Sequence, residues 1–463
     1  MARPTDHLTA ELGRRLGGTV RDLRRLSGGA SRITSSFDLE ADDGSRRPLI
    51  LQQERGHHLV PGSRVAIEST LLQAADGLGV PVPHVVAAGT DDGLDAGWLV
   101  VERLEGETIP RRLLRDPEWA AARQALTGQC GTALAAIHRI DPDGVPGLPR
   151  RDPLRHPLAY LDGLGEVRPC LELGARWLER HRPVPGPRVT VHGDFRLGNL
   201  LVGHDGLRAV LDWELAHAGD PVEDIGWLCA RSWRFGGSGH VGGFGDLADL
   251  LHAYEAAGGG HVAVATVRWW EVYAAVKWAV ICALQAASHL GGASRSVELA
   301  AIGRRVCESE WDLVTLLGLA PDDERPPVDA PTPTSVTGPF GRPTAAELVE
   351  AVREYLDGSI EPGAATRSSF DARVARNALG VVERELRLGP AIGRAHHDRL
   401  ARLGFPTDAA LAAAIRSGAF DHDIDNVGRA LASSTRDQLL VAHPAYLEAP
   451  DPVEGTGVGG GGV

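Results

Sequence analysis

A short hairpin flanked by acidic and amide side chains constrains this chain more than any other feature. Asp194 and Asn199 precede the hairpin, and Asp212 follows it. The stretches 200–202 and 207–211 are apolar enough to form two short strands around a glycine-containing turn. Folding them together sets Asn199 nearly opposite Asp212. Two oxygen-bearing side chains that are distant in sequence thereby become neighbours.

These three side chains form the set that phosphoryl transfer requires. Asp194 could accept the proton of an attacking hydroxyl group, while the Asn199 amide oxygen and Asp212 are hard ligands suited to Mg²⁺ on the phosphates of ATP. His192 opens the motif, and we expect it to brace the loop rather than bind metal. Glu214 could support the metal or the substrate, or be solvated. An ordinary hairpin with surface carboxylates would not need all three residues at these positions.

With this motif the chain resembles the aminoglycoside phosphotransferase and choline kinase superfamily. Three further segments carry the resemblance in the expected order: a glycine-rich phosphate loop at 26–32, an interlobe hinge at 98–106 and a segment after the metal ligand at 216–227. The resemblance implies an α+β, two-lobed protein-kinase-like fold. An N-lobe with an antiparallel sheet would span 1–105, and a helical C-lobe with the catalytic loop would span 106–320.

The resemblance also implies ATP and Mg²⁺ as cofactors and assigns residues to the nucleotide. The phosphate loop supplies Gly28, Gly29, Ala30, Ser31 and Arg32. Its glycines let the backbone approach phosphate closely and donate N–H groups. Adenine would meet the backbone of Glu102, Arg103 and Leu104. No Walker A sequence is present, so the pattern does not indicate a P-loop nucleoside triphosphatase.

One departure from the family concerns the cation on the third strand. Kinases place a strand Lys against the ATP phosphates and pair it with a helix Glu. Here the run 49–53 ends in glutamines, and Lys277, the only Lys of the chain, lies far along the expected C-lobe. We expect Arg55, on the same strand face as Gln53, to replace the Lys, braced by Glu68. Glu68 could equally be an exposed helix carboxylate.

Composition narrows the cellular setting more than the substrate. The formal charge of −13 argues against general binding to nucleic acid or to anionic membranes. The first residues lack the apolar core of a signal peptide, and no apolar run is long enough to span a bilayer, so we expect a cytoplasmic protein. The widely spaced cysteines predict reduced, packed thiols. The aromatic run 269–278 and His138 are expected to pack in the core.

The C-terminal third reads as a separate helical domain. Prolines concentrate in 321–342, which predicts a linker. A capping-box pattern at Thr344 then opens a helical domain over 343–450, with further helices at 370–388 and 407–417. This part resembles a small all-α domain attached to kinase-like proteins, so docking to a protein partner or homo-oligomerisation is the modest hypothesis. The glycine-rich tail 451–463 is expected to be disordered.

The acceptor is inferred from one further resemblance. The chain looks closest to the branch with kinase modules joined to acyl-CoA dehydrogenases, which implies a small-molecule hydroxyl substrate such as a hydroxyacyl-CoA. Arg231 and Arg234 would then face the CoA phosphates; the alternative is that they are surface arginines. Aminoglycosides, choline and hydroxylated amino acids remain open. A nucleotide-binding pseudokinase scaffold is the second class; the strand glutamines favour it, and the intact set of Asp194, Asn199 and Asp212 opposes it.

Overall fold

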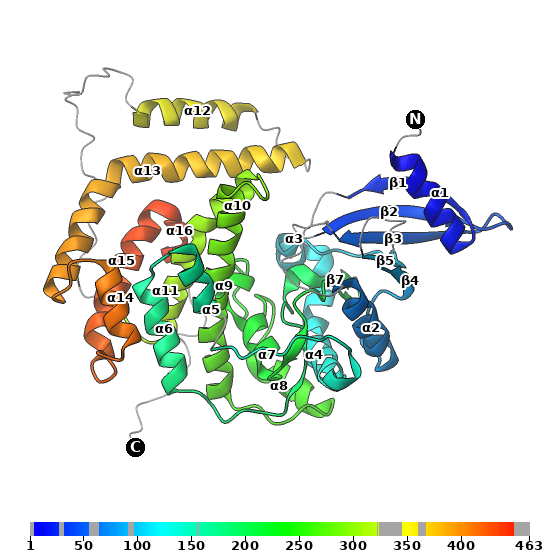
Figure 1. The fold of residues 1–463 in the computed structure, drawn as a ribbon, viewed down its shortest axis with the longest axis horizontal. Helices are drawn as coiled ribbons and strands as arrows, with labels where there is room; N and C mark the ends of the chain where they lie inside the picture. Colours follow the sequence, from blue (N-terminus) through cyan, green and yellow to red (C-terminus); the bar gives the residue numbers. More distant parts are fainter. Residues whose placement is uncertain are drawn as a thin grey trace. The chain divides into compact units, whose positions relative to one another are not determined.

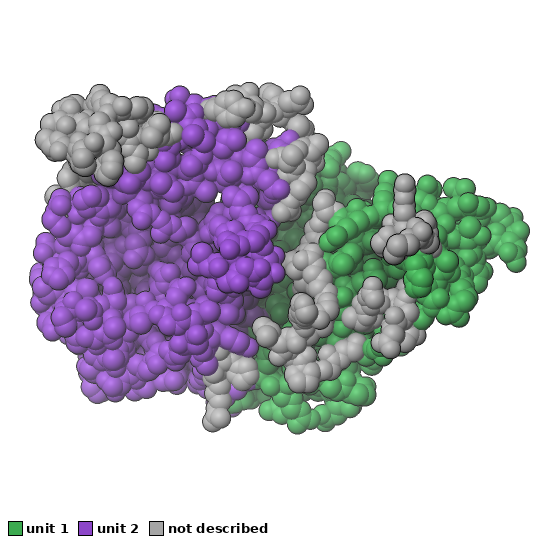
Figure 2. All heavy atoms as spheres, turned by 45° about the horizontal axis from the view of Figure 1, so that its top comes forward, with its two compact units in different colours: residues 1–151, 185–267 green, residues 152–184, 268–463 purple. Residues whose placement is uncertain are grey.

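The computed structural model describes residues 4–26, 32–54, 64–90, 97–154, 157–321, 323, 345–359 and 367–448. The expected phosphate-loop residues Gly28, Gly29, Ala30 and Ser31, the expected cation Arg55, most of the linker and the tail lie outside these ranges. The chain divides into two compact units, residues 1–151 with 185–267 and residues 152–184 with 268–463 (Figure 2). We call them unit 1 and unit 2.

Unit 1 begins with a five-stranded antiparallel sheet in the order β1-β2-β3-β5-β4 (Figure 1). Its strands are β1 (Thr19–Arg25), β2 (Arg32–Glu40), β3 (Arg46–Glu54), β4 (Val85–Gly89) and β5 (Trp98–Glu102), with helices α1 (Pro4–Leu16) and α2 (Arg64–Gly77). Leu49 and Leu51 of β3 join Leu12 of α1 in an apolar cluster on one face. Because neighbouring strand residues alternate, Ile50, Gln52 and Glu54 face the other way.

The rest of unit 1 carries the hairpin that the sequence predicts. Strands β7 (Leu200–Gly203) and β8 (Gly206–Val210) pair antiparallel, with Leu200 opposite Val210. A second small pair joins β6 (Val189–Val191) to β9 (His217–Gly219). The helices of this region are α3 (Pro110–Arg115), α4 (Ala120–Ile137), α7 (Val222–Cys229) and α8 (Leu247–Ala256). Helix α4 packs against both α8 and β8, which fixes the hairpin on a rigid support.

The described part of unit 2 is helical. Its elements are α5 (Pro157–Leu164), α6 (Pro169–Arg180), α9 (Val264–Leu290), α10 (Val297–Ile302), α11 (Val306–Leu316), α12 (Ala345–Ser359), α13 (Arg367–Arg402), α14 (Asp408–Arg416), α15 (Ile424–Ala442) and α16 (Ala445–Glu448). The aromatic residues of α9 that the sequence assigns to the core are buried. Helix α13 includes the expected 370–388 helix but continues through Pro390. Helix α12 lies alongside α13 (Figure 1).

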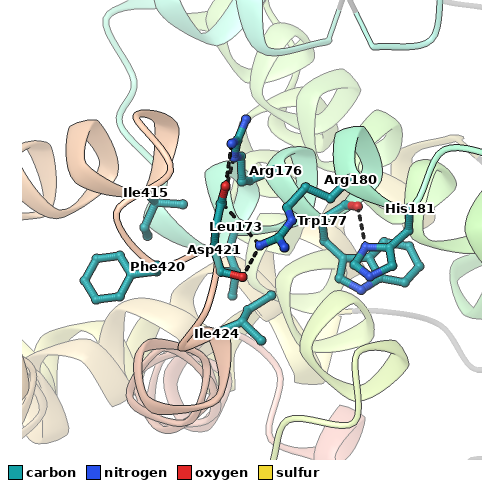
Figure 3. Close-up of a pocket in the computed structure, with 9 residues that line it drawn as sticks. All are labelled: Leu173, Arg176, Trp177, Arg180, His181, Ile415, Phe420, Asp421 and Ile424. Carbon is teal, nitrogen blue, oxygen red and sulfur yellow. Dashed lines mark hydrogen bonds and ion pairs between the residues drawn. The ribbon is translucent and has the colours of Figure 1, made fainter. Parts of the chain in front are cut away.

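The C-terminal helices pack on helices from the expected C-lobe. Helix α14 lies against α6, and α15 lies against α11. Arg176 of α6 forms an ion pair with Asp421 at 2.5 Å, at the edge of a small pocket whose apolar lining includes Leu173, Ile415 and Phe420 (Figure 3). The contacts therefore group the two helical regions in one unit, whereas the sequence places a domain boundary between them. The linker itself is almost entirely outside the described residues.

Two expectations from composition can be compared with the described residues. Every cysteine is buried and free of disulfide bonds, as expected for reduced, packed thiols. Among the helices of the described ranges, none combines the length and apolarity that a bilayer crossing demands.

Candidate active site

The loop after β6 is held by a carboxylate that the sequence does not single out. Asp224 of α7 accepts hydrogen bonds from the backbone N–H groups of His192 and Gly193, each at 2.8 Å. Gly193 has a φ of 79°, and a Cβ there would lie 2.4 Å from the carbonyl oxygen of Leu215. Only glycine fits this close approach. His138 contacts Asp224 at 3.3 Å, which matches its expected packing role.

His192 braces the same loop from inside. Its side chain is fully buried, and burial lowers its pKa, so the ring is neutral. Nε2 donates to the carbonyl oxygen of Leu211 at 3.1 Å, and Nδ1 accepts the backbone N–H of Asp194 at 3.2 Å. The ring thus ties the start of the loop to the end of the hairpin. This is the structural role that the sequence analysis expects for it.

Asp194 is oriented by three donors. Trp227 Nε1 donates to Oδ1 at 2.8 Å, Arg196 Nε donates to Oδ1 at 3.0 Å, and Asn199 Nδ2 donates to Oδ2 at 2.6 Å. The side chain retains 13% exposure, so a small molecule can reach it. Sequence reasoning missed Arg196, Trp227 and Asp224. Asp224 and Trp227 could have been found from their spacing, because residues three apart in a helix lie on the same face.

The hairpin brings Asn199 and Asp212 together as the spacing predicts. The backbone N–H of Leu211 donates to the carbonyl oxygen of Asn199 at 2.9 Å. With its Nδ2 turned to Asp194, Asn199 presents Oδ1 as the atom for a cation. Asp212 has a φ of 61°, a left-handed conformation that is uncommon outside glycine, asparagine and aspartate. Such local strain is typical of functional positions.

Negative charge accumulates around Asp212. Burial, together with Glu214, Asp194 and Glu68, raises the pKa of Asp212 to about 7, although Arg32 opposes the shift. A divalent cation would relieve this repulsion. A cation site with two ligating side chains, Asn199 and Asp212, would suit Mg²⁺, because that ion usually keeps water and phosphate oxygens as its other ligands. In the described ranges, no group of three or more His, Cys, Asp or Glu residues could hold a metal by itself.

Glu68 is buried and paired, but its partner is Arg32 of β2. Arg32 Nη1 contacts Glu68 Oε2 and also donates to Gln52 Oε1 at 3.2 Å. The alternative that Glu68 is an exposed helix carboxylate is therefore wrong, since its exposure is 3%. Burial raises the pKa of Glu68, against the opposing effect of Arg32. The expected pairing with Arg55 lies outside the described residues.

The strand phase of Gln53 differs from the expectation. Gln52 is the glutamine that contacts Arg32. Because Gln53 is its neighbour on an unbroken strand, Gln53 points to the opposite face, toward the cluster of Leu49 and Leu51. The expectation that Gln53 lies on the strand face of the phosphate-binding cation is therefore wrong by one residue, because Gln52 occupies the face of Arg32.

In the expected hinge, residues 98–106, part of the backbone forms hydrogen bonds with the sheet and with the residue just before β4. The N–H groups of Glu102 and Arg103 donate to the carbonyl oxygens of His84 and Pro48, each at 3.0 Å. The Arg103 side chain binds Asp38 at 2.9 Å. Of the three expected residues, Leu104 is thus the one whose N–H these sheet bonds do not occupy.

An aromatic wall borders Asp194 on the side of α7. The Cζ atom of Arg196 lies 4.7 Å from the centroid of the Trp233 ring, over its face. The Trp233 ring centroid lies 5.2 Å from that of Trp227 and 6.2 Å from that of Phe235. Arg234, which we expect from sequence to face CoA phosphates, is buried and donates to the carbonyl oxygen of Cys229 at 3.0 Å. The burial of Arg234 contradicts that expectation.

Comparisons with known proteins agree with this geometry. The model of the "Phosphotransferase enzyme family" matches residues 22–279, and that of a "Domain of unknown function (DUF6285)" matches residues 362–446. Acyl-CoA dehydrogenase family member 10 of Mus musculus is 27% identical over 202 residues, which cover 40% of this chain and 18% of that protein. Family member 11 of Gallus gallus is 26% identical over 220 residues, covering 44% and 27%. The chain thus matches under a third of the length of either relative.

A solved structure shows the fold. A protein from Ralstonia eutropha JMP134, provisionally described as an aminoglycoside phosphotransferase, superposes with a TM-score of 0.53 at 20% identity, over 68% of this chain and 98% of that one. The sheet and the helices that follow it are therefore those of a kinase-like fold, as the sequence resemblance implies. With the family model matching more than half of its length, the chain belongs to the phosphotransferase enzyme family.

Proposed function

We propose that this protein is an ATP- and Mg²⁺-dependent phosphotransferase that transfers the γ-phosphoryl group to a hydroxyl group of a small molecule. The observation that carries the proposal is the convergence of Asp194, Asn199 and Asp212 on one hairpin, with negative charge concentrated at Asp212. This arrangement is costly without a cation and has the side chains that phosphoryl transfer uses.

Each residue has a separate task in this proposal. Asp194, aimed by Trp227 and Asn199, accepts the proton of the acceptor hydroxyl as the new bond forms. Asn199 Oδ1 and the Asp212 carboxylate would hold Mg²⁺, which when bound neutralises charge on the phosphates. The backbone at Leu104 would meet adenine. The loop 28–31 would cover the phosphates through its backbone N–H groups.

The acceptor proposed is a hydroxyacyl-CoA or a related metabolite. The similarity to acyl-CoA dehydrogenase family members supports this class, although it covers only a fraction of those proteins. A second observation concerns charge. Arg196 lies beside Asp194 and stacks on Trp233, which places a fixed cation and an aromatic surface next to the base. Aminoglycosides and choline are the alternative acceptors, and the negative charge around Asp212 is compatible with a cationic substrate.

A screen of the purified protein with Mg·ATP against hydroxylated metabolites tests the proposal. Hydroxyacyl-CoAs, aminoglycosides, choline and hydroxylated amino acids are compared by product formation, with Asp194→Asn as the inactive reference. Acceptor-dependent phosphorylation that Asp194→Asn abolishes supports the proposal. Turnover of aminoglycosides with none of any hydroxyacyl-CoA would overturn the acceptor class. Tight Mg·ATP binding without transfer to any acceptor would instead support the pseudokinase scaffold.

A further inference from the structure

We propose that Arg32 is the cation that contacts the nucleotide phosphates, held in place by Glu68 and Gln52. The inference rests on the proposed function, because it assigns a residue within the same nucleotide site. It moves the cation of kinase sites from the third strand of the sheet to the second.

The first observation is an unsatisfied donor. Arg32 has an exposure of 8%, and its Nη1 atom is engaged by Glu68 and Gln52. Its Nη2 atom is buried and has no hydrogen-bond partner among the residues that the structure describes. Buried donors are almost always paired in folded proteins, so an orphaned one indicates a missing partner. For a guanidinium the preferred partner is an anion that can accept more than one N–H group.

The second observation is where this donor lies. Glu68, Glu214 and Asp212 all act electrostatically on Arg32, so the guanidinium lies within electrostatic range of Asp212, the proposed Mg²⁺ ligand. An ATP phosphate bridges a metal ion and a protein cation in kinase sites. Under this proposal, one phosphate oxygen would contact both Arg32 and the metal ion.

The third observation concerns the third strand. Gln52 of β3 lies on the same face as Arg32 of β2, since Thr34 is the residue paired with Gln52 and Arg32 pairs with Glu54. The face that carries a Lys in kinases here carries an amide oxygen that accepts from Arg32. Gln52 thus orients the cation instead of supplying one. Glu68 keeps its role as the helix carboxylate that positions the cation.

Nucleotide binding to the full chain tests this assignment without any acceptor. We compare wild type, Arg32→Gln, the double variant Arg32→Gln with Glu68→Gln, and the exposed control Arg21→Gln on β1, using calorimetric titration with Mg·ATP and with adenosine. Loss of a charged hydrogen bond predicts about 10- to 100-fold weaker Mg·ATP binding for both Arg32 variants. Adenosine affinity should not change, because adenosine has no phosphate. A purely structural role would weaken both ligands equally.

The double variant protects the test against misfolding, because it removes both charges of the buried pair. Relocating the cation, with Arg32→Asn and Gln52→Lys together, should recover much of the Mg·ATP affinity. Equal Mg·ATP affinity in wild type and the double variant would overturn the role of Arg32 and leave the proposed function standing. Wild-type protein that fails to bind Mg·ATP at all would overturn both.

Discussion

Buried carboxylates occur in both units, but they differ in the charged and polar groups that surround them. In unit 1, Asp212 lies among other acids, and Arg32 is the cation that opposes the rise of its pKa. In unit 2, three buried acids meet partners from the C-terminal helices. Glu172 pairs with Arg416, Glu308 contacts His443 at 2.9 Å, and Asp312 accepts from Tyr446 at 2.7 Å. The crowded acids in unit 1 are consistent with the proposed cation site, whereas the three paired acids in unit 2 contribute to the contact between helices.

The pKa of Asp212 in unit 1 is raised, whereas the pKa of Glu308 in unit 2 is lowered. Burial favours the protonated acid in both units. At Asp212 the neighbouring carboxylates add to this effect and raise the pKa to about 7. At Glu308 the effect of burial is overcome by His443 and Arg305, and the pKa falls below its usual value. Partner identity, not burial, therefore decides the outcome.

The largest effect should come from removing the C-terminal helices. Ending the chain at residue 321 removes Arg416, His443 and Tyr446, leaving Glu172, Glu308 and Asp312 without these partners. We expect unit 2 to lose cooperative unfolding, because the truncation also removes the buried apolar residues of α14 and α15 that pack on α6 and α11. The proline-rich linker suggests instead that the shortened chain folds alone. Calorimetry and circular dichroism of the truncated protein distinguish these outcomes, and a native-like transition would favour the linker interpretation.

The next effect concerns catalysis in unit 1. Asp194→Asn should lower turnover about 10²- to 10⁴-fold, because it removes a positioned base, and should leave Mg·ATP affinity nearly unchanged. Asp205→Asn is the matched control, since Asp205 lies in the turn of the same hairpin with a side-chain exposure of 83%. Steady-state kinetics on the acceptor found by the screen measure both. Wild-type turnover in Asp194→Asn would remove this residue from the mechanism.

A smaller effect concerns the melting temperature, which neutral substitutions of a buried acid should change in opposite directions in the two units. Asp212→Asn should raise the ligand-free melting temperature by a few degrees, because asparagine tolerates the left-handed φ and carries no charge. The same variant should lose the stabilisation that Mg·ATP gives. Glu308→Gln should lower the melting temperature, at a cost of about 1–3 kcal/mol, by weakening contacts to His443 and Arg305. Shifts of the same sign in the absence of ligand would break the comparison.

The smallest effect is on pH dependence. Because the pKa of Glu308 is lowered, its contribution to stability is complete above its unfolded value, near 4.5, and is lost as the pH falls through the folded value. Because the pKa of Asp212 is raised, ligand-free stability should fall as the pH rises from about 4 toward about 7. Melting temperatures across this range should show a flatter acid limb in Glu308→Gln and a flatter upper limb in Asp212→Asn. Unaltered profiles would contradict these assignments.

The sequence predicts contacts between residues that are close in the chain better than contacts between residues that are far apart in it. The hairpin that joins Asn199 to Asp212 is local, so spacing and turn residues were sufficient to predict it. The contact of Arg32 with Glu68 depends on how a strand and a helix pack, and no local pattern reports that. Gln53 was misplaced because a strand's phase, invisible in an isolated run, decides which face a side chain occupies.

The end of helix α13 was also not predictable from local sequence. Helix α13 was expected to stop at 388, since Gly389 and Pro390 are helix breakers, yet it continues to Arg402. Arg399, near its end, is buried and pairs with Asp437 of α15. Tertiary contacts of this kind outweigh local propensity, which is a weak guide once a helix face is buried.

The left-handed backbone at Asp212 has an evolutionary consequence. Asparagine and glycine are the residues that share aspartate's tolerance for this conformation, and neither carries a charge. The replacements that best preserve the fold at this position are therefore those that remove the charge of the proposed metal ligand, as asparagine does, or the ligand itself, as glycine does. A descendant could abandon catalysis by one substitution without penalty to its architecture. Among related chains, the residue at this position should accordingly separate active enzymes from inactive descendants better than overall similarity does.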